Sequence, residues 1–553
     1  MGIYGYLTVL SLLPFLVTAR INVTSQLFQL AGESASNNVK LTWALVDGAA
    51  SYEVLLLSES GSYTILATAP GDSWDIYNLT ASQTYQIHGV NGSTTIDTSD
   101  DVTVAPGSTV SDDLNTYNNT VAGSLSIRSD LVSNGTYYQY SYVTDSNGFS
   151  HFQMQTSADG YTFSGNTTVI TRDTVCASVD NGYCKLESIA IKQHPTTKQI
   201  IIWAHFENAV DYTLGEVAVI YGDPGEDLTF GGAFQPEGDD SRDLGFFADD
   251  DGSGYIITAI NTNTNLGLYA LNEDWTNVTS KVTTLQPGED REAPALVRDG
   301  DYYYLFTSTA AGWYPSQGKY ISSQNISGTW AASRNIGNVN TFGAQSGGVS
   351  KIGDTYLMRA NRWAAQWAIP EASNRQIVLP ISFADGVASF GFYHTLRYSD
   401  ESGVVVGVQN GKILSVGKTA NSSAGTSLAA GAANDGTQDD PENLFTPSEV
   451  PFWWQVDLGA AFNIHQVDIT PKQTGGSETY LQYNVTGSTD QQTWELLVNG
   501  TANTAVGFLT NNVDKDGTYR YIRLNVDKVI NIHNSNEADW AAGLHEVMVY
   551  GSG

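Results

Sequence analysis

A tight turn followed by a strand rich in aromatic or β-branched residues recurs five times in the middle of this chain, at a period of about 50 residues. The five copies begin at Asn134, Thr197, Asp251, Asp299 and Ile352. No helical spacing of apolar residues separates them, so each copy is expected to be a unit of strands. Units of this length stack to bury their apolar faces, and four-stranded units form propeller blades. The sequence therefore predicts a five-bladed β-propeller over residues 107–417.

Two shorter stretches of alternating strands flank the repeat. Residues 20–106 contain Trp43, a facing Tyr52 and a later Tyr85, and they resemble a small fibronectin type III domain with its tyrosine corner. This stretch lacks grouped polar and aromatic binding residues, so we expect a spacer rather than an adhesion or sugar-binding module. Residues 418–553 alternate as half-buried strands do and predict a second β-sandwich. The predicted fold class is all-β, a five-bladed β-propeller flanked by two β-sandwich domains.

The charge of the chain limits its partners. Among 553 residues, 25 Lys and Arg face 58 Asp and Glu, which gives a formal net charge of −33 spread along the sequence. Nucleic acids and anionic membranes need a cationic surface, so we expect neither as a partner. Nothing in the sequence indicates oligomerisation, and a monomer is expected.

Several features predict secretion. Residues 1–19 hold an apolar run that ends in Val17-Thr18-Ala19, as in a signal peptide. Asn-x-Ser/Thr sequons, the acceptors of N-glycans, begin at Asn22, Asn78, Asn91, Asn118, Asn134, Asn166, Asn277, Asn325, Asn421, Asn484 and Asn499. Cys176 and Cys184 are the two cysteines, and in an oxidising compartment they would close one small disulfide loop. We expect a secreted, extracellular glycoprotein.

Acids and amides recur at one place in the repeat. In a propeller the innermost strands start near the axis, and counting back about seven to ten residues from each turn selects Glu187, Asp243, Glu292 and Gln345. The first unit offers Ser124 or Ser126 and no carboxylate. A single acid before a strand would be a solvated cap, but four recurrences in phase favour a shared cleft. Carboxylates in one cleft suit glycoside hydrolysis, in which one carboxyl group must stay protonated.

Aromatic residues follow the fourth and fifth inner strands. Trp313 and Tyr314 lie after the fourth, and Arg362 and Trp363 after the fifth, where their faces could stack on a sugar ring. Packing in the core is an equal alternative for Trp363.

Ordered motifs in the middle domain resemble glycoside hydrolase family 43, and within it the exo-β-1,3-galactanases. The motifs are Arg291–Ala295, Tyr304–Ser308, Ala311–Gln317, Thr341–Ser346 and Asn361–Trp363. The resemblance implies a propeller and inversion at the anomeric carbon. It implies that Glu292 is the general acid, Asp243 the residue that tunes and orients it, Gln345 the holder of the attacking water, and Glu187 a substrate-binding carboxylate. Trp313, Arg362 and Trp363 complete the expected substrate site.

Two departures from that family bear on activity. The first unit has Ala122-Gly123-Ser124-Leu125 where the galactanase branch carries His-Gly-Gly and most of the family carries an Asp base. Glu187 is followed by Ser188 rather than by Arg-Pro-Lys. Contacts with substrate on that side of the site are therefore expected to differ.

The last domain resembles a factor 5/8 type C, or discoidin-like, domain such as carbohydrate-binding module family 32. Trp453–Gly459 and Leu544–Val547 carry this resemblance. It implies a structural calcium, for which Asp435 and Glu546 are the candidate ligands. His533 and Trp540 are candidate sugar contacts, with ordinary loop or packing roles as the alternative.

The leading hypothesis is a secreted exo-glycosidase that releases galactose from β-1,3-galactan, the main chain of arabinogalactan, with no cofactor for catalysis. The C-terminal domain would keep the enzyme near the polysaccharide. One alternative is an α-L-arabinofuranosidase or β-xylosidase of family 43. Another is a catalytically impaired, lectin-like protein, which the altered first unit favours and the retained Glu292 and Asp243 oppose.

Overall fold

The computed structural model describes residues 21–31, 37–107, 113–120, 123, 125–363, 375–475 and 477–553, with position 476 and the intervening segments left out. The predicted signal peptide, residues 1–19, lies outside this part of the chain. The described chain is nearly all β, and its helices are single turns: α1 (Arg172–Val175), η1 (Pro236–Gly238), α3 (Ser427–Ala430), η3 (Gly431–Ala433) and η4 (Asp539–Ala541). Among the described residues, no helix has the length and apolar character needed to cross a membrane.

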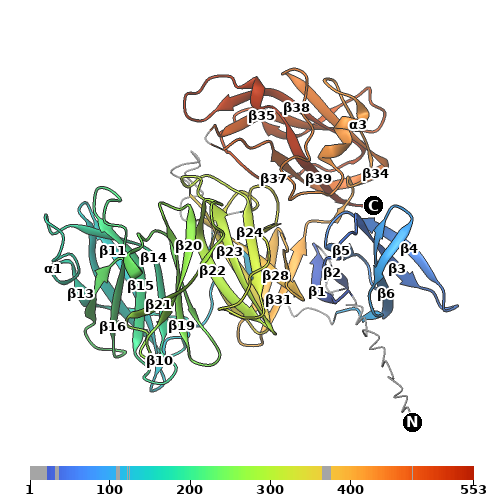
Figure 1. Cartoon of the computed structure of the whole chain (residues 1–553). Helices are drawn as coiled ribbons and strands as arrows, with labels where there is room; N and C mark the ends of the chain where they lie inside the picture. The colour runs from blue at the N-terminus through green and yellow to red at the C-terminus, as the bar shows by residue number, and fades with distance from the viewer. Residues whose placement is uncertain are drawn as a thin grey trace, which may run out of the picture.

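Five four-stranded antiparallel sheets follow one another along the middle of the chain, each in sequence order (Figure 1). The first sheet holds β10 (Val132–Ser133), β11 (Thr136–Asp145), β12 (Gly148–Ser157) and β13 (Ser164–Thr171). The second holds β14 (Cys184–Gln193), β15 (Ile200–Asn208), β16 (Glu216–Gly222) and β17 (Thr229–Phe234). The third holds β18 (Leu244–Ala248), β19 (Gly254–Ile260), β20 (Asn265–Leu271) and β21 (Val278–Leu285). The fourth holds β22 (Arg291–Asp299), β23 (Tyr302–Thr309), β24 (Gly318–Ser323) and β25 (Arg334–Ile336). The fifth holds β26 (Gln345–Ile352), β27 (Thr355–Arg362), β28 (Arg375–Ala384) and β29 (Val387–Phe390).

The five predicted turns each join the first and second strands of one of these sheets. The first strands β14, β18, β22 and β26 contact one another from sheet to sheet, and β12 of the first sheet contacts β14. Large apolar side chains such as Trp203, Tyr269 and Phe306 are fully buried between and within the sheets. The all-β class and the five units are confirmed, and the closure of the units into a propeller ring stays a prediction.

The predicted disulfide is confirmed between Cys176 and Cys184, whose Cα atoms are 5.3 Å apart. Both cysteines are fully buried, and they join the end of α1 to the first residue of β14. The bridge therefore anchors the strand on which Glu187 lies.

The N-terminal residues form two sheets with Trp43 and Tyr52 packed between them, their ring centroids 5.6 Å apart. One sheet contains β3 (Ser51–Leu57), β4 (Tyr63–Ala69), β6 (Gln83–Asn91), β7 (Thr94–Thr98) and β8 (Val102–Val104). The other orders β5 (Ser73–Ile76), β2 (Asn38–Trp43), β1 (Val23–Leu30), β31 (Val404–Gln409), β30 (Thr395–Ser399) and β9 (Asn115–Asn118).

The second of these sheets crosses the predicted domain boundary at residue 106. Strand β1 pairs in parallel with β31, so that Phe28 lies opposite Gly407. The N-terminal segment is thus hydrogen-bonded into the chain that follows the fifth four-stranded sheet. A fibronectin type III identity for this segment stays a prediction.

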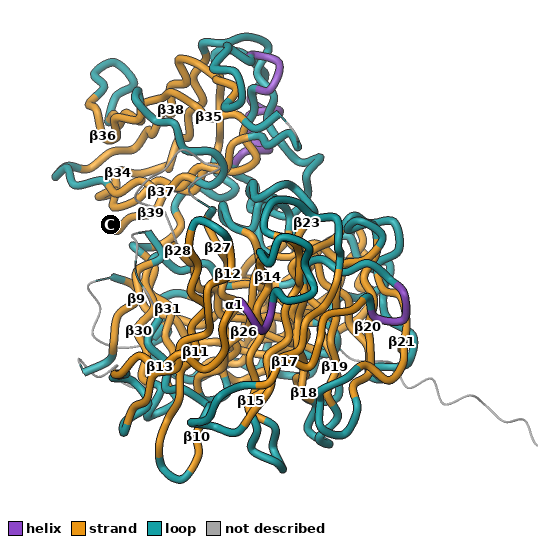
Figure 2. Tube along the Cα trace, turned by 90° about the vertical axis from the view of Figure 1, so that its left-hand side faces the viewer, coloured by secondary structure: helices purple, strands orange, loops and turns teal. Residues whose placement is uncertain are grey.

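The C-terminal residues form an eight-stranded sheet that lies above the other sheets in both views (Figures 1 and 2). Its strands are β32 (Lys412–Ile413), β33 (Thr419–Ser422), β34 (Phe452–Pro471), β35 (Thr479–Ser488), β36 (Glu495–Gly500), β37 (Leu509–Asn512), β38 (Thr518–Asn531) and β39 (Leu544–Ser552). Buried contacts join this domain to the rest: His394 Nε2 lies 2.9 Å from Asp468 Oδ2, and the Phe508 ring lies 5.0 Å from that of Phe392.

Candidate active site

The first strands of the second to fifth sheets border a pocket of about 1460 Å³. All four residues that the repeat selected line this pocket: Glu187 on β14, Asp243 directly before β18, Glu292 on β22 and Gln345 on β26. Equivalent positions in successive sheets therefore converge on one cavity, as the repeat predicted.

The first sheet contributes differently. Its described lining residues are Tyr142 and Thr144 of β11, and none of its described residues brings a carboxylate to the pocket. Ser126 is not a lining residue, and its amide donates to the Tyr398 hydroxyl at 2.9 Å. Ser124 lies outside the described residues.

Backbone irregularities accompany the functional side chains. The pairing register shifts after Glu187 in β14 and after Glu292 in β22, where Ser188 and Ala293 adopt φ angles of 48° and 51°. A bulge leaves a residue unpaired and bends the strand, which redirects the neighbouring side chains. Positive φ at a non-glycine residue costs about 1–3 kcal/mol, and such strain gathers at functional sites. The two glutamates thus sit where regular pairing is broken.

The environment of Glu292 favours its protonated form. Burial, and then the nearby charge of Asp243, raise the pKa of Glu292 to about 8 from its usual 4.5. Gln345 Nε2 donates to Oε1 at 2.7 Å, and Asn263 Nδ2 donates to Oε2 at 3.3 Å. A carboxyl group with this pKa carries its proton at neutral pH and can give it to a leaving group.

Asp243 joins the two bulges. The Ser188 hydroxyl donates to Oδ1 at 2.7 Å, and the Ala293 amide donates to Oδ2 at 3.1 Å. One carboxylate therefore holds the residue after Glu187 and the residue after Glu292. The arrangement fixes the strand that carries Glu292 and places Asp243 where it raises the Glu292 pKa.

The side-chain amide of Gln345 is held from both ends. Its Nε2 donates to Glu292 and, at 3.1 Å, to the Ser308 hydroxyl, while its Oε1 accepts from Trp363 Nε1 at 2.7 Å. These contacts define which end of the amide is the oxygen. An amide oxygen has two lone pairs, so Oε1 can still accept a hydrogen bond from a water molecule.

Glu187 lies in a cationic and aromatic surrounding. The Tyr212 hydroxyl donates to Oε1 at 2.9 Å, and Lys185 Nζ is 3.4 Å from the same oxygen. Burial acts to raise the pKa of Glu187, but His205, Lys185 and Tyr212 outweigh it and lower that pKa. A charged carboxylate in the pocket can accept hydrogen bonds from sugar hydroxyls.

The two predicted tryptophans line the pocket, whereas the predicted arginine does not. Trp313 and Trp363 line the pocket with 45 % and 39 % of their surface exposed, and Trp313 has a φ of 72°. Arg362 is buried, does not line the pocket and donates from Nη2 to the Phe342 carbonyl at 2.8 Å. The structure therefore does not bring Arg362 to the pocket, unlike the two tryptophans.

Among the pocket residues that sequence reasoning missed are three polar side chains close to the glutamates, those of Tyr212, Asn263 and His205. Tyr212 and Asn263 lie on loops between second and third strands, outside the counted inner-strand positions. Asn263 belongs to the polar run Asn261–Asn265, in which residues 261 to 263 all have positive φ. This asparagine-rich run could have indicated an irregular loop near the pocket, because asparagine tolerates the left-handed conformation.

Asp435 and Glu546 lie together in the C-terminal domain. Glu546 is 1 % exposed, and its carboxylate has no side-chain donor among the described residues, with the Gly436 backbone as a weak donor nearby. Burial, and then the charge of Asp435, raise the pKa of Glu546 well above its usual range. A buried carboxylate with so few donors is costly unless a cation compensates it. No group of three or more His, Cys, Asp or Glu that could hold a metal ion is found among the described residues.

Two stretches of the chain match known families. Residues 231–376 match the model for glycosyl hydrolases family 43, and residues 417–544 match the F5/8 type C domain. The first stretch carries Asp243, Glu292 and Gln345, whereas Glu187 lies before it. No match was found among curated proteins.

Solved structures of two exo-β-1,3-galactanases are similar to this chain. A variant of the Phanerochaete chrysosporium protein with β-1,3-galactotriose is 20 % identical with a TM-score of 0.50, covering 79 % of this chain and 100 % of that one. The Clostridium thermocellum protein is 22 % identical with a TM-score of 0.48, covering 74 % of this chain and 99 % of that one. At 20 % identity, the similarity to the Phanerochaete chrysosporium structure supports the fold alone.

Proposed function

We propose that this chain is an inverting glycoside hydrolase that releases galactose from the ends of β-1,3-galactan. The observation that carries the proposal is the carboxyl group of Glu292, which stays protonated to about pH 8 inside a pocket that also holds Asp243, Glu187 and Gln345. The match of residues 231–376 to glycosyl hydrolases family 43 supports hydrolysis of a glycosidic bond.

Each group has a role in the proposed reaction. Glu292 gives its proton to the glycosidic oxygen as the bond to the anomeric carbon breaks. A water molecule that donates a hydrogen bond to Gln345 Oε1 attacks from the opposite face and loses its proton to solvent. Asp243 orients Glu292, and Glu187 binds sugar hydroxyls. Trp313 and Trp363 offer ring faces on which a sugar can stack.

The choice of galactan rests on Gln345. The amide is held between Glu292 and Trp363 in the lining of the pocket, which supports a water-holding role, and the first sheet brings no described carboxylate to act as base. The Phanerochaete chrysosporium structure, which is similar in fold, is named an exo-β-1,3-galactanase, and this supports the choice of substrate. An α-L-arabinofuranosidase or β-xylosidase would use an aspartate base.

The test compares three proteins on debranched β-1,3-galactan, arabinan and xylan oligosaccharides. Glu292→Gln should lower galactose release by about 10²–10⁴-fold, the usual contribution of a general acid, with the fold retained. Glu289→Gln is the matched control, because Glu289 is bonded to Lys319 and Ser333 and does not line the pocket. Wild-type rates in Glu292→Gln would refute the role of Glu292 as the general acid. A wild-type protein that binds these oligosaccharides but releases no sugar would support the lectin-like alternative.

We also propose that the protein is secreted and that Asp435 and Glu546 bind a structural calcium ion. Of the eleven sequon asparagines, only Asn118 and Asn484 are half-buried and the rest are exposed, which leaves room for glycans. Calcium should raise the melting temperature of the wild type with increasing concentration. At 100 times the dissociation constant the free energy of unfolding should be about 2.7 kcal/mol higher than without calcium. Glu546→Gln should abolish this response.

A further inference from the structure

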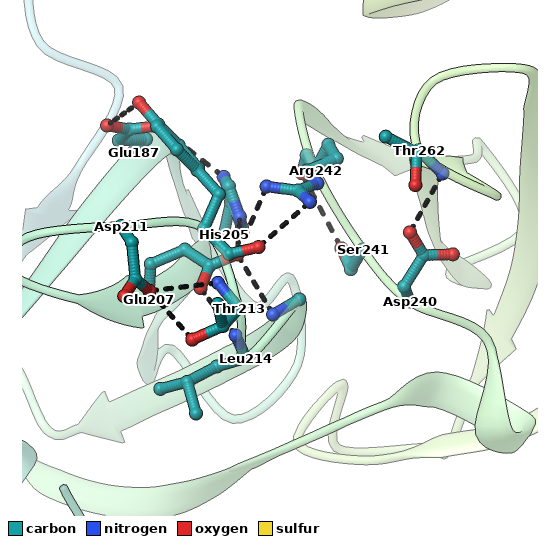
Figure 3. A network of polar contacts seen from close by, with 12 residues as sticks. Glu187, His205, Glu207, Asp211, Thr213, Leu214, Asp240, Ser241, Arg242 and Thr262 are labelled. Carbon is teal, nitrogen blue, oxygen red and sulfur yellow. Dashed lines mark hydrogen bonds and ion pairs between the residues drawn. The ribbon is translucent and has the colours of Figure 1, made fainter.

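A buried carboxylate lies just behind the pocket. Glu207, on β15, is 1 % exposed and does not line the cavity. Its oxygens accept from the amides of Leu214 and Gly215 at 2.8 and 2.9 Å and contact His205 Nε2 at 3.1 Å and Arg242 Nη1 at 3.4 Å (Figure 3). A buried carboxylate is tolerated when it has this many donors, and it then fixes their positions.

The partners of Glu207 lead to three residues of the pocket. His205 Nδ1 faces Glu187 Oε2 at 3.6 Å. Arg242 directly precedes Asp243, and its Nη2 donates to the Tyr212 carbonyl at 2.9 Å. The Leu214 and Gly215 amides close the loop that carries Tyr212, whose hydroxyl reaches Glu187.

The geometry around His205 favours an imidazolium. Its two ring nitrogens face two carboxylates, Glu207 on one side and Glu187 on the other, and only a doubly protonated ring attracts both. The other charged groups nearby are Lys185 and Arg242, and the Tyr212 ring stacks on the imidazole at 6.0 Å. Burial acts to lower the pKa of His205, but the two glutamates outweigh it and raise that pKa.

We propose that Glu207 is a positioning residue of the active site, which acts through His205 on Glu187, through Arg242 on Asp243, and through the loop amides on Tyr212. This inference rests on the proposed function, since the groups it positions are those of the proposed hydrolase. Glu207 itself touches no substrate.

Glu207→Gln is the direct test. It replaces one accepting oxygen by an NH2 group, which then faces an N–H donor that had donated to the carboxylate. Displacement of a positioned group by about 1 Å costs about 100-fold in rate, so kcat/KM on β-1,3-galactooligosaccharides should fall by about that factor, with the displacement of Glu187 seen in KM and that of Asp243 in kcat. Asp468→Asn is the matched control, because Asp468 is equally buried, is paired with His394 and does not line the pocket. If both variants lose thermal stability and neither loses kcat/KM, Glu207 is only structural.

A double-mutant cycle with Glu187→Gln separates positioning from general damage. If Glu207 acts through Glu187, the KM effect of Glu207→Gln should largely vanish in the Glu187→Gln background. If the effects of Glu207→Gln and Glu187→Gln on KM are additive, Glu207 does not act through Glu187.

A spectroscopic readout decides the network without any substrate. Histidine labelled with ¹³C and ¹⁵N should show His205, identified by its loss in His205→Gln, as an imidazolium at pH 7 in the wild type and in Asp468→Asn. It should become neutral in Glu207→Gln. A neutral His205 in the wild type overturns the inference. A wild type that releases no sugar, with His205 behaving as expected, would refute the proposed function and leave the network standing.

Discussion

The carboxyl group of Glu292 must be buried enough to keep its proton and open enough to release it into the pocket. Burial and Asp243 meet the first need, and a place in the lining meets the second. Its hydrogen-bond donors, Gln345 and Asn263, would favour the charged form, and they lower the cost of the carboxylate left after proton transfer. The pKa of Glu292 is therefore set by opposing contributions, with burial and Asp243 raising it and hydrogen-bond donors lowering it.

This tuning predicts a pH-dependent stability effect. The pKa of Glu292 is raised in the folded protein to about 8, so the stabilisation is fully present below the unfolded value of 4.5 and is lost as pH rises to about 8. Glu292→Gln should melt near the wild-type temperature at pH 4 and above it at pH 9, as calorimetry can measure. The kcat/KM profile should fall on its alkaline side near pH 8.

Glu289→Gln should behave in the opposite way. Burial acts to raise the pKa of Glu289, but Ser333 and Lys319 outweigh it and lower that pKa, so the charged form stabilises the fold above the unfolded value. This variant should melt below the wild type at neutral and alkaline pH.

Equal melting curves for Glu292→Gln and the wild type at pH 9 would contradict the raised pKa of Glu292.

At the scale of strands, periodicity determined how much of the site could be predicted. Glu187, Glu292 and Gln345 were found because a short inner strand separates each of them from its turn by only seven to ten residues. Tyr212 and Asn263 lie on loops whose conformation no strand period specifies. The parallel pairing of β1 with β31 could not be predicted either, because the paired residues are far apart in sequence.

The strand that carries Glu187 is anchored by the disulfide at its first residue. Cross-linking residues 176 and 184 closes a short loop, for which loop-closure entropy gives about 2–3 kcal/mol of stabilisation. Replacing both cysteines by alanine, which buries no new polar group, should lower the free energy of unfolding by about that amount in urea titrations. An unchanged unfolding midpoint would show that the bridge does not stabilise this sheet.

At the scale of the whole molecule, the C-terminal domain is packed on the connection between the fourth and fifth sheets and on the segment that follows β29. Phe508 packs against Phe342 and Phe392, and Asp468 pairs with the buried His394. Tyr314, next to the pocket residue Trp313, contacts His533 of this domain at 5.3 Å between ring centroids. The domain is therefore held beside the pocket by buried contacts as well as by its linker.

Deletion of residues 418–553 should consequently damage the remaining chain. It would expose the rings of Phe342 and Phe392 and leave His394 without its carboxylate partner. The truncated protein should melt at a lower temperature and aggregate in size-exclusion chromatography, whereas the full chain should elute as a monomer. A soluble truncated protein with the wild-type melting temperature would show that the interface contributes no stability.

The most direct test of the proposed function is a time-resolved ¹H NMR measurement of the wild-type protein with debranched β-1,3-galactan. An inverting exo-enzyme that uses Glu292 as acid and a water held by Gln345 should release galactose first as the α-anomer, before mutarotation produces the β-anomer. Release of the β-anomer first would contradict the assigned water-holding role of Gln345. No galactose from galactan, with arabinose or xylose released from the other glycans, would contradict the substrate.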